Sequence, residues 1–428
     1  MKLTFSGLRF SRAAHLFLRC CLLPAAMLLP VCQVSLAAES IAAPAGKLMI
    51  IGGALRYDNL QIWQPLIAAA GGSQARVAII AVASAQPQQA GQQVQQVLSA
   101  YGVSAGLLDL PRDPAPDTEA DAKDQAAQQS AVNRIDQATA VYFTGGDQRR
   151  ITRALRYASG KPTPMLEAII RLYQRGGLIA GTSAGAAMMS ERMFANPGTV
   201  LSVMQQGATA SQALTSGLGF AGPGILIDQH FLIRGRLGRL LAGLQASGTA
   251  LGIGVDENTA LYVEGQRYAQ VYGYKGVMFA SLPVRSADAV SGVLRIPNAQ
   301  LHYLSHGDRI DLQTLAITPA ADKQAIPQET HPEAAQLRTR YGDVLANTVI
   351  PEMMFQLMES QAGQISGLAF DAAAKEQSTG FELVLRKNPQ SRAWYGVSSG
   401  MTQYTITGLQ LELLPVTVQA LQIQPIQP

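Results

Sequence analysis

The residues GTSAGA at positions 181–186 form a G-x-S-x-G pattern centred on Ser183. They follow a short apolar run, residues 177–180, and open an alanine-rich stretch that favours helix. A nucleophile elbow needs this strand–turn–helix setting, because small flanking residues let the backbone turn sharply beneath a projecting serine. A glycine-rich turn that merely closes a strand gives the same pattern, so Ser183 predicts hydrolase chemistry only together with a base.

A serine hydroxyl becomes a good nucleophile when a neighbouring base takes its proton, and histidine is the usual base. His230 ends the apolar run 225–230 (ILIDQH), and active sites gather at the carboxyl ends of parallel strands. His302 and His306 lie in a later region, and His331 lies in a polar stretch. His230 is therefore the best-placed base, with a buried structural histidine as the alternative interpretation.

The base in turn needs an acid that orients the imidazole and stabilises its protonated form. Residues 252–258 (GIGVDEN) end another apolar strand with two carboxylates, Asp256 and Glu257. Either could serve, and spacing alone does not choose between them.

A second glycine turn, FTGGDQ at residues 143–148, closes a further strand. Its N–H at Gly146 could meet a developing oxyanion together with the N–H of Ala184. Gln148 is suited to hydrogen-bond a substrate amide or carboxylate. The alternative is a tight turn with no role in chemistry.

Three arginines, Arg234, Arg236 and Arg239, follow the candidate base within RGRLGR. A guanidinium group binds a carboxylate through two parallel hydrogen bonds, so the run favours an acidic peptide substrate. A solvated basic helix face would have the same sequence.

Along the chain, short apolar segments that predict strands alternate with segments that predict helices. This alternation is typical of an α/β fold with a mostly parallel sheet sandwiched by helices. Helices are expected at residues 86–101 and 165–175, and a surface loop at 112–130. Strands are expected at residues 46–53, 76–84, 103–110, 138–146, 177–180, 225–227 and 251–255.

The later part of the chain has a different pattern. Segments after about residue 280 are polar and irregular, and residues 318–336 have a linker-like composition. From residue 380 onward, alternating apolar residues predict antiparallel strands. The expected organisation is a catalytic domain over residues 46–317 and a linker with a smaller β-rich C-terminal extension over residues 318–428.

The first 38 residues have the features of a secretory signal peptide, with an uncleaved membrane anchor as the alternative. Basic residues precede an apolar run that ends in small residues, and cleavage is expected near Ala37 or Ala38. All three cysteines lie in this segment, so the exported protein would have no thiol nucleophile. Four of the 33 basic residues and none of the 29 acidic ones lie there, so net charge gives no support for nucleic-acid binding.

Together, IIGG (50–53), FTGGDQ (143–148), GTSAGA (181–186), DQHFLIRGRLGRL (228–240) and GIGVDENTAL (252–261) resemble the cyanophycinases, relatives of the dipeptidase E family of serine peptidases. The resemblance covers roughly residues 46–315 and implies a sandwich related to class I glutamine amidotransferases, usually dimeric. It puts the nucleophile on Ser183, the base on His230 and the acid on Glu257. It implies substrate contacts at Gln148, Asp228, Gln229, Arg234, Arg236 and Arg239.

The implied reaction is hydrolysis of cyanophycin, multi-L-arginyl-poly-L-aspartate, to β-aspartyl-arginine dipeptides. Asp228 or Asp147 would then face the substrate guanidinium, and the arginines its free α-carboxylates. The expected enzyme is secreted, periplasmic or extracellular, and uses no metal and no cofactor. After signal cleavage it is expected to have no contact with the membrane.

Two other readings remain open: an aspartyl dipeptidase with the same triad, and an inactive periplasmic binding protein. A glutamine amidotransferase is disfavoured because that chemistry uses cysteine at the elbow, where this chain has Ser183.

Overall fold

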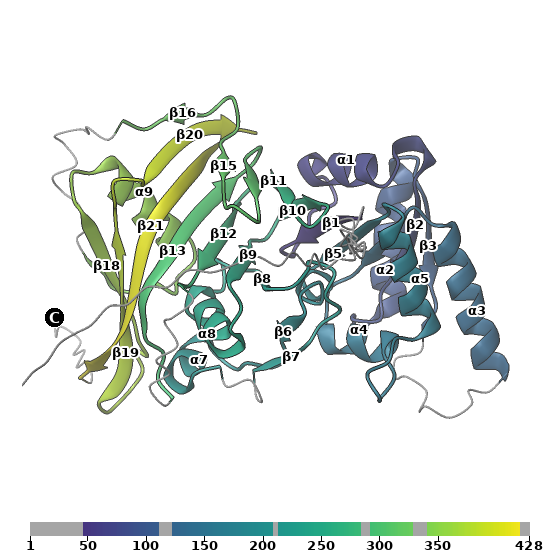
Figure 1. The fold of residues 1–428 in the computed structure, drawn as a ribbon, viewed down its shortest axis with the longest axis horizontal. Coiled ribbons are helices and arrows are strands. Elements are labelled where there is room, and N and C mark those ends of the chain that lie inside the picture. The colour runs from purple at the N-terminus through teal and green to yellow at the C-terminus, as the bar shows by residue number, and fades with distance from the viewer. Residues whose placement is uncertain (1–45, 111–121, 209–212, 284–291, 328–339, 420–428) are drawn as a thin grey trace, which may run out of the picture. The chain divides into compact units, whose positions relative to one another are not determined.

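Two large sheets form the described part of the chain, which comprises residues 46–110, 122–208, 213–283, 292–327 and 340–419 of a computed structural model (Figure 1). The predicted signal peptide, residues 1–38, lies outside these ranges. No helix within them is long and apolar enough to cross a membrane.

The first sheet has a parallel core, β1-β5-β4-β2-β3, to which antiparallel strands are added beyond β1. The core strands are β1 (Lys47–Ile51), β5 (Leu178–Thr182), β4 (Ala140–Phe143), β2 (Arg76–Ile80) and β3 (Ser104–Leu108). The added strands are β10 (Thr259–Glu264), β11 (Tyr268–Gly273), β14 (Arg309–Asp311) and β15 (Ile317–Thr318).

Both faces of this parallel core are buried, which explains the nearly continuous apolar runs of its strands. Leu48 and Ile50 pack on one face, whereas Met49 and Ile51 pack on the other. The helices are α1 (Leu60–Ala69), α2 (Pro87–Ala100), α3 (Ala122–Gln137), α4 (Gln148–Leu155), α5 (Pro164–Gln174), α6 (Ala184–Ala187), α7 (Val200–Gln206), α8 (Leu237–Ser247) and α9 (Val349–Glu359), with a 3₁₀ turn at Gly72–Gln74. Helices α1 and α2 cover the Met49 face, and α3, α4 and α5 cover part of the Leu48 face.

The second sheet is mostly antiparallel and runs in the order β17-β18-β19-β21-β13-β12-β9-β8, with β20 and β16 paired beside β21. Its strands are β8 (Ile225–Gln229), β9 (Leu251–Val255), β12 (Gly276–Ser281), β13 (Ile296–Ser305), β16 (Gln324–Ala325), β17 (Arg340–Tyr341), β18 (Gln364–Ala369), β19 (Ser378–Arg386), β20 (Arg392–Ser398) and β21 (Met401–Val418). A small separate pair joins β6 (Arg192–Phe194) and β7 (Leu214–Ser216).

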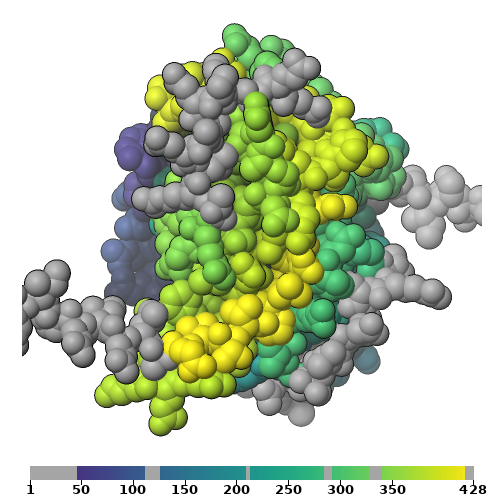
Figure 2. All heavy atoms as spheres, turned by 90° about the vertical axis from the view of Figure 1, so that its left-hand side faces the viewer, coloured from purple at the N-terminus to yellow at the C-terminus, as the bar shows by residue number. Residues whose placement is uncertain are grey.

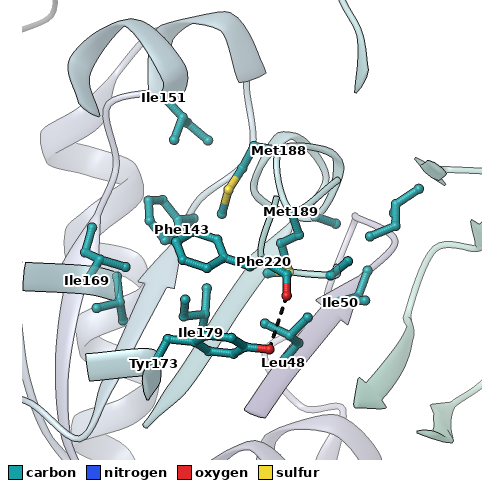
Figure 3. Packing of buried hydrophobic residues seen from close by; sticks show 14 of the residues in the cluster. Leu48, Ile50, Phe143, Ile151, Ile169, Tyr173, Ile179, Met188, Met189 and Phe220 are labelled. Carbon is teal, nitrogen blue, oxygen red and sulfur yellow. Dashed lines mark hydrogen bonds between the residues drawn. The ribbon is translucent and has the colours of Figure 1, made fainter. Parts of the chain in front are cut away.

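One apolar cluster joins the two sheets, because it contains Leu48 and Ile50 of β1 together with Ile253 and Val255 of β9. Beneath the predicted elbow, Phe143, Met188 and Met189 pack in this cluster (Figure 3). The hydroxyl of Tyr173 donates a hydrogen bond to the Phe220 carbonyl at 3.1 Å in the same region (Figure 3). The predicted elbow thus rests on a continuous apolar base.

The expectation of one mostly parallel sheet was wrong in its extent. The predicted strands at residues 225–227 and 251–255 form β8 and β9, which are parallel to each other but belong to the second sheet. The reason is non-local, since β9 pairs with β12 more than twenty residues later in the chain. A short apolar run carries no information about which sheet it will join.

Two local expectations were also wrong. The loop predicted at residues 112–130 overlaps α3, whose Ala131, Val132 and Ile135 are buried at helical spacing. The region after residue 280, expected to be irregular, contains the ten-residue strand β13. Its apolar residues were obscured because exposed polar residues interrupt its first half.

The C-terminal strands are not a separate sheet. Strand β21 pairs with β13 on one side and with β19 on the other, so the region after residue 318 continues the second sheet. Figure 2 shows the lime and yellow residues of this region across the centre of one face. The boundary expected at residues 317/318 therefore cuts through β15 of the first sheet and separates β13 from its partner β21 in the second. Part of the expected linker, residues 328–336, lies outside the described residues.

Candidate active site

Ser183 lies in a sharp turn between β5 and α6. Its φ of 54° and ψ of −110° are unusual for a residue with a side chain, and such strain costs on the order of 1–3 kcal/mol. The Ser183 N–H donates to the Ile51 carbonyl at 2.9 Å, which fixes the turn against β1. A Cβ on Gly185 would lie 2.6 Å from the Phe143 carbonyl oxygen, so the first turn of α6 can approach β4 only with a small residue there.

His230 follows β8 and reaches the serine. Its Nε2 lies 2.9 Å from Ser183 Oγ, within hydrogen-bond distance. Its backbone N–H donates to the Gly52 carbonyl at 2.7 Å, and its φ of 46° is again in the left-handed region. The strand end, the turn after it and the β1 loop together hold the imidazole against the serine.

Glu257 follows β9 and completes a chain of hydrogen bonds. Its Oε1 lies 2.6 Å from His230 Nδ1. Asp256, the other carboxylate of the motif, faces away from the imidazole: its Oδ1 accepts the Glu257 N–H at 2.9 Å, and its Oδ2 lies 3.6 Å from Lys275 Nζ. Of the two carboxylates that the sequence offered, Glu257 is the one that lies against the imidazole.

Burial lowers the pKa of His230 below its usual value, since the protonated ring is poorly solvated there. The hydrogen bond that Glu257 accepts from the ring raises this pKa, while the nearby positive charges of Arg234 and Arg236 lower it. The net direction is downward, so the ring is neutral at neutral pH and can accept the Ser183 proton. Burial also raises the pKa of Asp256.

A pocket of about 330 Å³ opens in front of Ser183 and His230. The residues expected from the sequence to contact substrate all line it: Gln148, Asp228, Gln229, Arg234, Arg236 and Arg239. Gly146 lines it as well, and Ala184 is the first residue of α6, directly after the serine. The structure therefore brings the candidate residues together around one cavity.

The three arginines differ sharply in their surroundings. Arg239 grips Asp228 with two nitrogens, its Nε lying 2.8 Å from Oδ2, and Arg236 Nη1 lies 3.2 Å from Oδ1. The side chains of Asp228, Arg236 and Arg239 are buried, whereas Arg234 is exposed. Burial lowers the pKa of Arg236 to about 10. Asp228 thus pairs with two arginines and leaves one excess positive charge, and Arg234 adds a third guanidinium at the pocket.

Other polar groups around the pocket have partners that limit their freedom. The Gln148 amide nitrogen donates to the Phe194 carbonyl, and Gln229 Oε1 lies 3.4 Å from Ser183 Oγ. Asp147 accepts the Arg149 N–H at 2.9 Å as the N-cap of α4 and also pairs with the Arg149 guanidinium. The expectation that Asp147 or Asp228 faces a substrate cation is weakened, because each carboxylate already pairs with arginine.

Phe194 was not among the predicted site residues, but it lines the pocket. The centre of its ring lies 4.6 Å from the Arg239 guanidinium carbon. No pattern near Phe194 would have revealed it. The other two candidate histidines in the described ranges bond to the backbone elsewhere. His302 Nδ1 accepts the Gly408 N–H at 3.2 Å, and His306 Nδ1 accepts the Gly273 N–H at 3.2 Å. His331 lies outside the described residues.

Within the described ranges, no three His, Cys, Asp or Glu side chains are grouped as a metal ion would require. The candidate site brings together a serine, an imidazole, a carboxylate and a pocket wall with three arginines.

The chain is similar to several known proteins. The sequence profile of peptidase family S51 matches residues 48–271. A cyanophycinase from Nostoc sp. is 32% identical over 288 residues, covering 64% of this chain and 88% of the relative. A cyanophycinase from Geminocystis herdmanii is 32% identical over 279 residues, covering 63% and 94%. The crystal structure of a peptidase from an acI-B1 Actinobacterium aligns with a TM-score of 0.45 and 20% identity, over 63% of this chain and 98% of that one.

Proposed function

The chain belongs to peptidase family S51, and from this premise we propose that it is an exported serine exopeptidase that hydrolyses cyanophycin to β-aspartyl-arginine dipeptides. One observation carries the proposal: Ser183, His230 and Glu257 form a continuous hydrogen-bonded chain at a pocket walled by arginines. We also propose that the parallel core of the first sheet has the architecture of a class I glutamine amidotransferase.

In the proposed mechanism, Ser183 Oγ attacks the scissile carbonyl carbon while its proton moves to His230 Nε2. Glu257 holds the Nδ1–H and stabilises the imidazolium that forms. Collapse of the tetrahedral intermediate breaks the C–N bond, and His230 returns the proton to the leaving amine. Water then attacks the Ser183 ester, again giving its proton to His230, and the carboxylate product leaves with Ser183 restored.

The negative charge on the carbonyl oxygen needs donors during both steps. We assign this role to the backbone N–H groups of Gly146 and Ala184. Ala184 begins α6 directly after the nucleophile, and Gly146 lines the same pocket. Losing one such donor typically lowers kcat by about 10²–10³-fold.

The charge of the pocket supports an acidic substrate. Arg234, Arg236 and Arg239 bring three positive charges against the single carboxylate of Asp228. Cyanophycin has a free α-carboxylate on every β-linked arginine, and we propose that Arg234 binds this group because its guanidinium is the exposed one. Arg236 and Arg239 would act from behind, by holding Asp228 and the positive potential of the wall.

We further propose that the protein acts outside the cytoplasm. The proposal rests on residues 1–38, whose basic start, apolar run and small-residue end are typical of a cleaved signal peptide. The N-terminal sequence of the protein recovered from the producing cells tests it: a mature end near Ala37 or Ala38 is expected, and an intact Met1 on membrane-bound protein would contradict it. Homodimer formation stays a prediction.

The decisive experiment is mass spectrometry of the products from purified protein and cyanophycin, with Ser183→Ala as control. β-Aspartyl-arginine from the wild type and none from the variant is the expected result. Cleavage of small aspartyl dipeptides without cyanophycin turnover would favour the dipeptidase alternative. Absence of both, with no labelling of Ser183 by a fluorophosphonate, would favour a binding protein.

A further inference from the structure

The turn that ends β1 touches all three segments of the candidate site. Three successive carbonyls accept three backbone N–H groups: Ile51 from Ser183 at 2.9 Å, Gly52 from His230 at 2.7 Å and Gly53 from Asn258 at 3.0 Å. These donors belong to the nucleophile turn, the base turn and the acid turn, which come from strands of two different sheets. The β1 turn is thus a shared reference for residues distant in sequence.

Gly53 has a specific relation to the base. A Cβ built on Gly53 would lie 2.3 Å from His230 Cε1, 2.4 Å from Nε2 and 2.9 Å from Nδ1. These contacts are far inside normal van der Waals distance, so the imidazole occupies the space that any side chain at position 53 would need. Nε2 is the atom that faces Ser183 Oγ, and Nδ1 is the atom that faces Glu257.

We propose that Gly53 is a positioning residue for the base: its bare backbone forms the wall against which the His230 imidazole is seated between Ser183 and Glu257. This inference rests on the proposed function, in which His230 carries the proton. A methyl group at position 53 displaces the ring by about 1 Å, and a misplacement of that size can reduce turnover by ~10²-fold.

A glycine with nearly the same φ provides a matched control. Gly53 has φ = +114° and Gly71 has φ = +113°, so alanine is about equally unfavourable at both positions. At Gly71, however, the nearest atom to an added Cβ is the Ala75 nitrogen at 3.8 Å, an ordinary contact. Gly71 lies at the end of α1, before the 3₁₀ turn, and takes no part in the site. The two variants therefore share nearly the same φ but differ in the clash with the imidazole.

The first measurement compares Gly53→Ala with Gly71→Ala for kcat and KM on cyanophycin and for the rate at which a fluorophosphonate labels Ser183. We expect Gly53→Ala to lower kcat and the labelling rate by roughly 100-fold relative to Gly71→Ala, with KM changed far less, because the chemical step depends on the base. Values within twofold of Gly71→Ala would overturn the proposal.

The second measurement needs no activity. The drop in Tm caused by Gly53→Ala should be larger in the wild type than in a His230→Ala background, where the ring is absent; there it should match the drop caused by Gly71→Ala. Equal drops in both backgrounds would show that the imidazole and position 53 do not compete for space, which also overturns the proposal.

These arms separate the two proposals. If the wild type is labelled at Ser183 but leaves cyanophycin intact, the substrate proposal fails. The labelling rate of Gly53→Ala, and its drop in Tm with and without the His230 ring, still test the role of Gly53. If the wild type is neither labelled nor active, the hydrolase proposal fails, and the thermal coupling alone decides whether Gly53 seats the imidazole.

Discussion

The two sheets end at the same site but hold their residues there by different means. The first sheet presents Ser183 from the interior of a parallel core, through a strained turn locked to β1. The second sheet presents His230 and Glu257 from β8 and β9, the parallel pair at one edge of an otherwise largely antiparallel sheet. Backbone hydrogen bonds to the β1 turn hold the Ser183, His230 and Glu257 segments alike, whereas only the segments from the second sheet also have buried charged side chains, Asp228 and Asp256, beside them.

The buried charges explain how an edge pair can be held firmly. Asp228 of β8 is gripped by Arg236 and Arg239, and Asp256 after β9 lies next to Lys275. Each carboxylate is nearly inaccessible, so its partners replace the water it has lost. The comparison therefore predicts two kinds of damage: loss of chemistry from the triad and loss of stability from the charged supports.

The largest effect is expected from the triad itself. Ser183→Ala and His230→Ala should each lower kcat on cyanophycin by roughly three or more orders of magnitude, and the double variant should be no worse, because the two residues act as one unit. Ser216→Ala, at an exposed serine of β7, is the control and should leave kcat unchanged. Additive losses would show that the two sheets do not deliver a single catalytic unit.

Substitutions of the two adjacent carboxylates, Glu257 and Asp256, should lower kcat by very different factors. Glu257→Gln removes the charge that stabilises the imidazolium, and should lower kcat by about 10²–10⁴-fold. Asp256→Asn retains an oxygen for the Glu257 N–H, so a loss below about tenfold is expected. Steady-state kinetics of the two variants, with Tm measured beside them, checks this. A greater loss from Asp256→Asn would mean that Asp256 is the acid.

The charged support of β8 should appear in stability. Asp228→Asn leaves Arg236 and Arg239 buried without their counter-charge, and breaking a buried pair in this way costs about 3–5 kcal/mol of unfolding free energy. Denaturant unfolding measures it. Asp136→Asn, which disrupts the solvent-exposed pair with Arg171, should cost about 0–1 kcal/mol. Similar losses in both variants would mean that the Asp228 cluster does not support the base segment.

Arginine-to-lysine variants test whether the three arginines of the pocket have different roles. Arg234→Lys should lower kcat/KM on cyanophycin by roughly tenfold to a hundredfold with Tm unchanged, because an ammonium lacks the planar fork that binds a carboxylate. Arg236→Lys and Arg239→Lys should lower Tm, since their forks hold Asp228. If Arg234→Lys keeps wild-type kcat/KM, the carboxylate-binding role of Arg234 is wrong. If the loss for Arg234→Lys follows its Tm, the role is structural.

The sequence was sufficient for features encoded in short segments. The setting of Ser183, the strand ends before His230 and Asp256, and the glycine turn at Gly146 are local patterns, and the structure has a strand before each one. Local patterns predicted these residues because a residue that directly follows a strand lies near the sheet edge where the strand ends, whichever strands it pairs with. They identify the components of the site without identifying how the strands pair.

The remaining features depend on contacts between distant segments. Nothing near β9 indicates that it pairs with β12, so its membership in a second sheet was not predictable. The run of Arg234, Arg236 and Arg239 is equally compatible with a solvated helix face, and only the fold shows that two of these side chains are buried against Asp228. Likewise, both glycines at the end of β1 were visible, but the imidazole beside Gly53 was not.

The smallest expected effect concerns the pH at which the base loses its proton. Burial lowers the pKa of His230, so the acidic limb of kcat/KM should lie below the usual histidine value of about 6.5. Arg234 contributes to this lowering by its charge, whereas Glu257 opposes it through its hydrogen bond.

Removing the positive charge in Arg234→Gln should therefore move the limb to higher pH, and Glu257→Gln should move the limb of its residual activity to lower pH. Profiles of kcat/KM against pH, measured on a neutral ester substrate so that substrate binding by Arg234 does not interfere, give both shifts. Movement of the two variants in the same direction would show that His230 is not the titrating base. Unchanged limbs would show that the charges at the pocket wall do not reach the imidazole.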